Sequence, residues 1–243
     1  VAYIWQRFYK NFFSLISKSH QNVDKMKYRK NILKIAVDSP AAAGAGTLCK
    51  TISKYYNLLY LDTGKIYRMI AYLKINNQSK YNESFIKKEI RNLNLDKLKN
   101  KKLLTDEIGT EASLIAKNKN IRKLVHSFQL KCAYNPPKRF DGSCLDGRDI
   151  TYKIIPDANF KFFITANIRT RALRRYNELK GLNKRINYKD VVKNIKKRDK
   201  SDYNRKISPL KKTKDSILIN TSNLSKRACF LKIKKIIDKK IRY

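Results

Sequence analysis

Short apolar runs recur along the chain and end in polar or small residues. Runs of this kind, flanked by turn-forming residues, are typical of buried strands. The runs are residues 32–37, 58–61, 144–145, 160–164 and 216–220. Between them, apolar residues recur at helical spacing, as Leu48, Ile52 and Tyr55 do after the first run. The alternation predicts an α/β fold with a five-stranded, mainly parallel sheet and helices on both faces.

The intervals between the predicted strands differ in character. Helical spacing predicts helices over residues 111–129, 169–179, 188–200 and 225–243. Residues 76–102 are polar and lysine-rich with weak helical spacing, and we interpret a segment of about 76–110 as a small insertion in a domain spanning 31–243. Asp38, Asp62 and Asp146 each follow a predicted strand. Because ligands of such sheets bind beyond the carboxyl ends of the strands, these aspartates mark the expected site.

A run of small residues follows the first predicted strand. It consists of Ser39, Pro40, Ala41, Ala42, Ala43, Gly44, Ala45, Gly46 and Thr47. Backbone N–H groups of such a loop can surround a phosphate, and the next helix adds its positive end. The general pattern is G-x-x-x-x-G-K-[ST]. Here Ser39 replaces the first glycine and Ala45 stands where the lysine belongs, so the segment alone also fits an ordinary strand-to-helix turn.

The chain is strongly basic, with 57 Lys and Arg against 19 Asp and Glu and a net charge of +38. Such a charge can indicate a polyanion as partner. However, 41 of the basic residues are Lys, spread along the whole chain. A surface selected for phosphate would favour Arg, whose planar fork binds phosphate through two hydrogen bonds. We therefore interpret the charge mainly as compositional drift, with an RNA-binding surface as the alternative.

Other features restrict the class of protein. The four cysteines are far apart and only two histidines are present, so a zinc site is not expected and the thiols suit a reducing compartment. No run approaches the roughly 18 apolar residues of a membrane span. Residues 1–30 are aromatic and basic, and the first methionine is Met26. We interpret 1–30 as an extension that is either unstructured or not translated, with an amphipathic segment as the alternative.

Several segments together resemble the bacterial cytidylate kinases, a family of nucleoside monophosphate kinases. They are DSPAAAGAGTLCK at 38–50, DTGKIYR at 62–68, residues 111–122, DGRDI at 146–150, PDA at 156–158, residues 171–175, and Arg198–Asp199 with the spaced residues up to Leu210. The combination of D-G-R-D-I with R-D-x-x-D-x-x-R-x-x-x-P-L is specific to this family rather than to phosphate-binding loops in general. The resemblance runs from about residue 32 to the C-terminus.

The resemblance implies a CMP-binding set on the acceptor side. The matching positions are Thr63, Arg68, Ser113, Arg122, Asp149, Arg198 and Asp202. Arginine forks suit the acceptor phosphate, and a carboxylate can accept a hydrogen bond from the cytosine amino group. Uracil lacks that donor, so UMP is expected to bind less well.

The resemblance also implies a lid, residues 169–187, whose arginines close over ATP and the phosphoryl group in transfer. The cationic residues that we place in catalysis are Lys65, Arg148, Arg171, Arg175, Arg198 and Arg205. Phosphoryl transfer depends mainly on positioning and electrostatics, so no general base is required. Asp38 and Asp146 are candidates to hold Mg²⁺ through water, although Asp146 could equally act as a cap.

The chain departs from the family pattern at several positions. Ala45 removes the cation that normally contacts the phosphates of the nucleotide. Lys65 follows Asp62-Thr63-Gly64 at the end of the second strand, and our hypothesis is that it supplies the missing charge. A surface lysine is the alternative. Gly109 stands where the family usually has Arg, and Thr151-Tyr152 replaces the usual Gly-Thr.

The sequence thus predicts a cytoplasmic, monomeric enzyme that transfers the γ-phosphoryl group of ATP to CMP or dCMP with Mg²⁺. Its partners would be small-molecule substrates, with no membrane and no required nucleic acid. A broader UMP/CMP kinase is one alternative. The other is a catalytically impaired relative that binds RNA through its basic surface.

Overall fold

The computed structural model describes residues 32–181 and 186–241. These residues belong to one compact unit, residues 31–243. The prediction for residues 1–30 lies outside the described residues. In the described part of the chain, no helix is both long enough and apolar enough to cross a bilayer.

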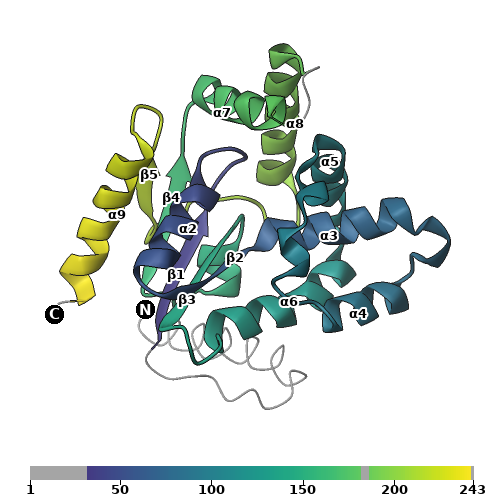
Figure 1. The fold of residues 1–243 in the computed structure, drawn as a ribbon, viewed down its shortest axis with the longest axis horizontal. Coiled ribbons are helices and arrows are strands. Elements are labelled where there is room, and N and C mark those ends of the chain that lie inside the picture. Colours follow the sequence, from purple (N-terminus) through teal and green to yellow (C-terminus); the bar gives the residue numbers. More distant parts are fainter. Residues whose placement is uncertain (1–31, 182–185, 242–243) are drawn as a thin grey trace, which may run out of the picture. The chain divides into compact units, whose positions relative to one another are not determined.

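The five predicted strands form one sheet, and every pair of neighbours is parallel (Figure 1). The strands are β1 (Leu33–Asp38), β2 (Leu58–Asp62), β3 (Gly142–Gly147), β4 (Phe160–Thr165) and β5 (Ile217–Asn220), in the order β2-β3-β1-β4-β5. In this register Asp38 pairs with Gly147, and Asp62 pairs with Asp146. The carboxyl ends of β1, β2 and β3 therefore lie at one edge, as the sequence predicts.

Helices cover both faces of the sheet because its strands are buried on both sides. The side chains of β1 alternate: Ile35 and Val37 pack with α2 (Ala45–Tyr55) and α9 (Lys226–Ile241), whereas Ala36 belongs to the opposite cluster. The elements of that opposite cluster include α3 (Thr63–Asn76), α6 (Lys119–Tyr134) and the short π-helical turn η4 (Ile150–Ile154). The predicted layered architecture is confirmed.

The segment between β2 and β3 corrects one prediction. Its further elements are η1 (Gln78–Lys80), α4 (Glu83–Arg91), η2 (Lys97–Lys99), η3 (Lys101–Leu104) and α5 (Asp106–Ile115). Residues 111–129 are not one helix, because α5 ends at Ile115 and α6 begins at Lys119. The Asn118 side chain accepts hydrogen bonds from the backbone N–H groups of Asn120 and Ile121, and this N-cap starts a new helix.

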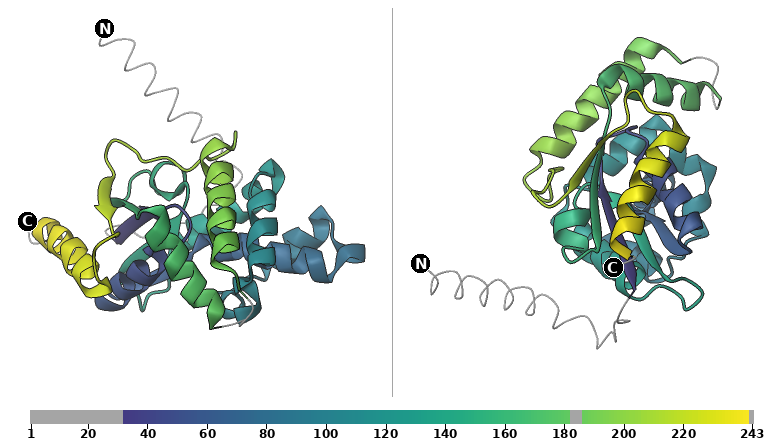
Figure 2. Two further views of the ribbon diagram at one scale, coloured as in Figure 1. Left: turned by 90° about the horizontal axis from the view of Figure 1, so that it is seen from above. Right: turned by 90° about the vertical axis from the view of Figure 1, so that its left-hand side faces the viewer.

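Two helices rich in basic residues, α7 (Ile168–Lys180) and α8 (Tyr188–Asn204), pack against each other. Ala172, Leu179, Val191 and Ile195 form the small apolar cluster between them. Both helices lie beyond the carboxyl ends of the strands (Figures 1 and 2). They cover the edge of the sheet at which the loop after β1 is found.

Candidate active site

A cavity of about 870 Å³ lies at the carboxyl ends of β1, β2 and β3. Its walls come from the loop after β1, the start of α3, α5, and the two helices α7 and α8. Pockets for small ligands measure roughly 300–1,000 Å³, so this cavity can hold an extended ligand. All nine residues of the predicted phosphate loop, 39–47, contribute to its lining.

The loop itself has the backbone geometry of a phosphate-binding turn. Gly44 has φ of 90° and precedes α2 as its N-cap, and Ala42 has φ of 59°. Glycine adopts this left-handed conformation at little cost, which explains Gly44. No side chain caps α2, so the N–H groups of its first turn are left for another acceptor. Such a helix start is suited to bind an anion.

Two arginines of α7 bind carbonyl oxygens of this loop. Arg171 Nη1 donates to the carbonyl oxygen of Ala41 at 3.0 Å and pairs with Asp199 of α8 at 2.6 Å. Arg174 Nη1 donates to the carbonyl oxygen of Ala43 at 3.2 Å and to Thr221 Oγ1 at 2.9 Å. Both arginines therefore fix the loop through its carbonyl groups. Arg171 does so from a buried position.

Three arginines from different elements lie close together in the cavity lining. Arg68 of α3, Arg175 of α7 and Arg198 of α8 all line it. Burial, and then the charges of Arg198 and Arg175, lower the pKa of Arg68 to about 9. Burial and the charge of Arg148 also lower the pKa of Arg198, whose buried Nε has no hydrogen-bond partner among the described residues. Such a cluster is electrostatically unfavourable until an anion neutralises it.

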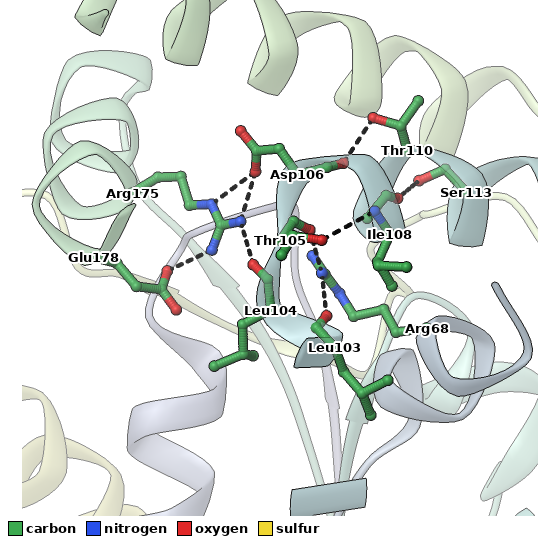
Figure 3. A network of polar contacts seen from close by, with 11 residues as sticks. Arg68, Leu103, Leu104, Thr105, Asp106, Ile108, Thr110, Ser113, Arg175 and Glu178 are labelled. Atoms are coloured by element: carbon green, nitrogen blue, oxygen red, sulfur yellow. Dashed lines mark hydrogen bonds and ion pairs between the residues drawn. The ribbon is translucent and has the colours of Figure 1, made fainter. Parts of the chain in front are cut away.

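Two of these arginines hold the segment before α5 (Figure 3). Arg68 Nη1 donates to the carbonyl oxygens of Leu103 and Thr105, and Arg175 Nη2 donates to that of Leu104 at 2.9 Å. Arg175 also pairs with Asp106 at 2.6 Å and with Glu178 at 2.8 Å. The carbonyls at the end of a short helix lack intrahelical donors, and the arginines supply them. We call the Arg175–Asp106 pair the latch, because it joins α7 to α5.

A carboxylate pair also lines the cavity. Asp62 and Asp146 are partners in neighbouring strands and both line the cavity. Burial, and then the charge of Asp62, raise the pKa of Asp146 well above its usual range. Tyr60 Oη donates to Asp146 Oδ1 at 3.2 Å, and a Cβ at Gly46 would lie 3.6 Å from Asp146 Oδ2. This carboxylate therefore lies against the phosphate loop, where a cation would stabilise its charged form.

The comparisons with known proteins decide the family. The family model for cytidylate kinase matches residues 35–239. The chain belongs to the cytidylate kinase family. The cytidylate kinase of Bartonella tribocorum is 41% identical over 197 residues, which cover 81% of this chain and 90% of that protein. The cytidylate kinase of Clostridium tetani is 39% identical over 220 residues, which cover 85% and 94%.

A solved structure shows the fold alone. It is that of an uncharacterised protein from Eubacterium ventriosum, which superposes with a TM-score of 0.50 at 17% identity. The superposition covers 85% of this chain and 98% of that one.

Many of the predicted site residues line the cavity. Besides the loop, they are Lys65, Arg68, Ser113, Asp146, Arg148, Arg175 and Arg198. They come from α3, α5, α7, α8 and the end of β3, so the fold brings together positions far apart in sequence. Ser113 Oγ donates to the carbonyl oxygen of Gly109 at 3.2 Å within its own helix.

The predicted pair Arg122 and Asp149 lies outside the cavity lining. Both side chains are buried and form an ion pair with each other. Arg122 also donates to the carbonyl oxygen of Ala116 at 3.2 Å and packs over the ring of Tyr67 at 5.4 Å. The pair thus satisfies two charges that would be costly to bury separately.

Three further predicted residues lie beside the cavity rather than in its lining. Asp202 accepts from Arg148 Nε at 2.7 Å, so it contacts a residue that does line the cavity. Arg205 donates to the carbonyl oxygen of Ser208 at 2.6 Å and lies 3.6 Å from Asp202. Thr63 Oγ1 donates to the carbonyl oxygen of Asp146 at 2.8 Å.

The structure gives Asp38 a role that differs from the predicted contact with Mg²⁺. Its fully buried carboxylate accepts from Ile150 N at 2.8 Å, Thr151 N at 2.9 Å and Thr151 Oγ1 at 2.6 Å. Burial raises the pKa of Asp38 to about 6, although the hydrogen bonds from Thr151 oppose this shift. Asp38 is therefore committed to holding η4 against β1, and Thr151, a departure from the family pattern, is one of its donors.

Other residues of the site were not among the predicted ones. Asp199 and Asp106 form ion pairs with Arg171 and Arg175 of α7, and Thr221 holds Arg174. Spacing could not reveal these contacts, because Thr221 lies 47 residues from its arginine and Asp106 lies 69 residues from its own. Gly109 could have been found from the sequence, because it stands where the family usually has Arg. A Cβ there would lie 2.7 Å from Arg68 Nη2, so glycine makes room for that guanidinium.

The latch predicts a measurable effect on the ligand-free protein. Replacing Asp106 with alanine removes the carboxylate that holds Arg175 to α5. The carboxylate is partly exposed, so the pair is worth only about 1 kcal/mol. We expect hydrogen exchange of the α7 amides to accelerate roughly fivefold. The matched control is Glu107→Ala, which removes an exposed carboxylate of the same helical turn. Equal exchange in the two variants would contradict the latch.

Proposed function

We propose that this chain transfers the γ-phosphoryl group of ATP to CMP or dCMP, giving ADP and CDP or dCDP. The observation that carries this proposal is the layout of the cavity. A phosphate loop, a cluster of three arginines and a buried carboxylate beside the loop all line one cavity. Two phosphorylated ligands placed end to end match this distribution of charge.

The donor end would hold the triphosphate of ATP. The N–H groups of residues 43–47 and the start of α2 offer hydrogen bonds to phosphate oxygens. Arg171 and Arg174 tie the carbonyl groups of the same loop to α7. These contacts hold the loop in one conformation before the nucleotide binds, which reduces the entropic cost of binding.

The acceptor end would hold the phosphate of CMP between Arg68 and Arg198. Both guanidiniums line the cavity, and the unpartnered Nε of Arg198 is a donor for an anionic oxygen. Asp202, behind Arg148, and Asp149, paired with Arg122, are the carboxylates that we assign to the sugar and base. We expect CMP to exchange part of these ion pairs for its own hydroxyl and amino groups.

The residues around the carboxylate pair suit Mg²⁺ bound mainly through the nucleotide. Among the described residues, no group of three or more metal-ligating side chains is present, so an all-protein metal site is not expected. The buried Asp146 and the Thr47 hydroxyl offer hard oxygen ligands on the loop side of the cavity. Mg²⁺ prefers such a set, completed by phosphates and water. When bound, the ion would neutralise charge on the β- and γ-phosphates.

The transfer itself needs little covalent chemistry from the protein. An oxygen of the CMP phosphate forms a bond to the γ-phosphorus while the bond from that phosphorus to the β,γ-bridging oxygen breaks, and ADP leaves with the electron pair. The attacking oxygen is already anionic, so no side chain has to remove a proton. The arginines align the two phosphates and offset their mutual repulsion, and the lid helices exclude water.

A panel of acceptors tests this proposal. The full chain is assayed for ADP release with Mg²⁺–ATP and either CMP, dCMP or UMP at equal concentration. We expect CMP and dCMP to be phosphorylated at least about tenfold more efficiently than UMP, since uracil has no amino group for the carboxylate to bind. Equal rates with CMP and UMP would favour the broader kinase. ADP release that does not depend on CMP, dCMP or UMP would contradict the proposal.

A further inference from the structure

The phosphate loop of this chain lacks a cation that its general pattern supplies. In the pattern, a lysine of the loop reaches the β- and γ-phosphates. Here the position is Ala45, whose methyl group packs in the apolar cluster between α2 and the sheet. The backbone geometry of the loop is nevertheless kept, with Gly44 at φ of 90°. The loop can therefore hold a phosphate but cannot itself neutralise charge beside the γ-phosphate.

Lys65 lines the same cavity and comes from α3 rather than from the loop. It lies in the first turn of α3, where its backbone N–H donates to the capping carboxylate of Asp62 at 3.3 Å. Lys65 and Arg68 both line the cavity, three positions apart, and so lie on one face of the helix. Ile66 and Tyr67, between them, are buried in the core. The helix therefore directs Lys65 inward, one turn nearer the strand end than Arg68.

That position lies between the two proposed phosphate sites. Asp62, which caps α3, lies opposite Asp146 in the register of β2 and β3. The carboxylate of Asp146 lies against Gly46 of the loop. Arg68, one turn further along α3, belongs to the arginine cluster at the acceptor end. The first turn of α3 thus stands between the loop and the acceptor arginines, and a flexible lysine there can reach the group in transfer.

Most other cations of the cavity have partners or are exposed, and Arg68 and Arg198 belong to the arginine cluster. Arg148 pairs with Asp202, Arg175 with Asp106, and Arg174 is held by Ala43 and Thr221. Four more lysines line the cavity but are exposed: Lys50, Lys117, Lys197 and Lys226. Lys65 is only partly exposed, and within residues 32–181 and 186–241 no carboxylate forms an ion pair with its ammonium group.

We infer that Lys65 replaces the missing loop lysine and binds the β- and γ-phosphate oxygens of ATP from the α3 side of the cavity. The inference rests on the proposed function for its turnover readout, but it also makes a claim about ATP binding alone. Arg174 is a poorer replacement, because its guanidinium already donates to the carbonyl oxygens of Ala43 and Thr221. A lysine on α3 would also keep its position relative to Arg68, on the same helix, rather than relative to the loop.

The test removes the cation from α3 and returns a lysine to the loop. The full chain is prepared as wild type, Lys65→Met, Ala45→Lys and the double variant. Lys54→Met is the control, since Lys54 is an exposed lysine on α2 outside the cavity lining. For each protein the affinities for Mg²⁺–ATP and for AMP are measured by calorimetry, and turnover is measured with ATP and CMP. Thermal unfolding confirms that each variant folds.

We expect Lys65→Met to bind ATP about tenfold more weakly, to keep its affinity for AMP, and to lower kcat about 100-fold. Ala45→Lys in the same chain should restore most of both losses, because it returns the cation to the loop. If wild type shows no turnover with CMP but the ATP affinities follow this order, the proposed function fails and the role of Lys65 stands. Unchanged ATP affinity in Lys65→Met, or losses that Ala45→Lys does not restore, would overturn the inference.

Discussion

Replacement of Arg198 by methionine is expected to lower the rate of phosphoryl transfer to CMP by about 10³-fold, the scale on which an arginine stabilises a transferring phosphoryl group. Arg198 lines the cavity, and its Nε has no partner among the described residues. Its pKa is lowered by burial and by Arg148, so the side chain is held in an unfavourable state that an anion would relieve. The structure thus keeps a costly cation in the cavity, which is expected where the cation serves the substrate.

The same substitution should stabilise the ligand-free protein. Removing this partly buried guanidinium, whose Nε has no partner among the described residues, relieves repulsion with Arg68 and Arg148, so the unfolding temperature should rise by a few degrees. The matched control is Lys200→Met, which removes an exposed charge from the same helix. Steady-state kinetics with CMP and thermal unfolding without ligand measure the two effects. An Arg198→Met protein with turnover close to that of Lys200→Met would show that Arg198 does not contact the substrate.

Replacement of Asp146 by asparagine is expected to raise the unfolding temperature of the ligand-free protein at pH 7 and to lower turnover. Burial and Asp62 raise the pKa of Asp146, so the folded protein binds a proton there more tightly than the unfolded chain does. The contribution of this group to stability is therefore greatest below about pH 4 and is lost as the pH rises through the raised pKa. The asparagine side chain carries no charge and keeps an oxygen for the Tyr60 hydroxyl, so the variant should unfold at a temperature a few degrees higher at pH 7.

Activity should change in the opposite direction. Without the carboxylate, the site loses the Mg²⁺ ligand that we propose beside the loop, and turnover should fall by about 10³-fold with a higher requirement for Mg²⁺. Asp190→Asn, at an exposed carboxylate of α8, is the control. Unfolding temperatures from pH 4 to pH 8 and Mg²⁺ titrations of turnover measure both effects. If Asp146→Asn destabilises the ligand-free protein at pH 7 or leaves turnover intact, Asp146 has a structural role instead.

The sequence predicted the fold well because the strands are short, apolar and bounded by turn residues. Its weakest point was the third strand, of which residues 144–145 gave the only apolar signal. The strand begins at Gly142, where a Cβ would lie 1.9 Å from the carbonyl oxygen of Leu33. A close backbone approach thus selects glycine, although glycine is a poor strand former. The break at Asn118 was missed because apolar periodicity continues across it.

The site was predictable where local motifs determine it and unpredictable where tertiary contacts do. The loop at 39–47 and the cavity arginines follow from their motifs. The burial of Asp38 under Thr151 does not, because it depends on a contact 113 residues away. The same holds for the latch between Arg175 and Asp106. Charge composition was a poor guide to the site, since most lysines are exposed and only a few of the basic residues line the cavity.

The central claim is that the loop and the arginine cluster hold a donor and an acceptor of the same phosphoryl group. The most direct measurement incubates the full chain with Mg²⁺, CMP and ATP labelled in its γ-phosphate and separates the products. The account predicts that the label appears in CDP in a one-to-one ratio with ADP. Label released only as inorganic phosphate, or retained in ATP under conditions where both nucleotides bind, would contradict it.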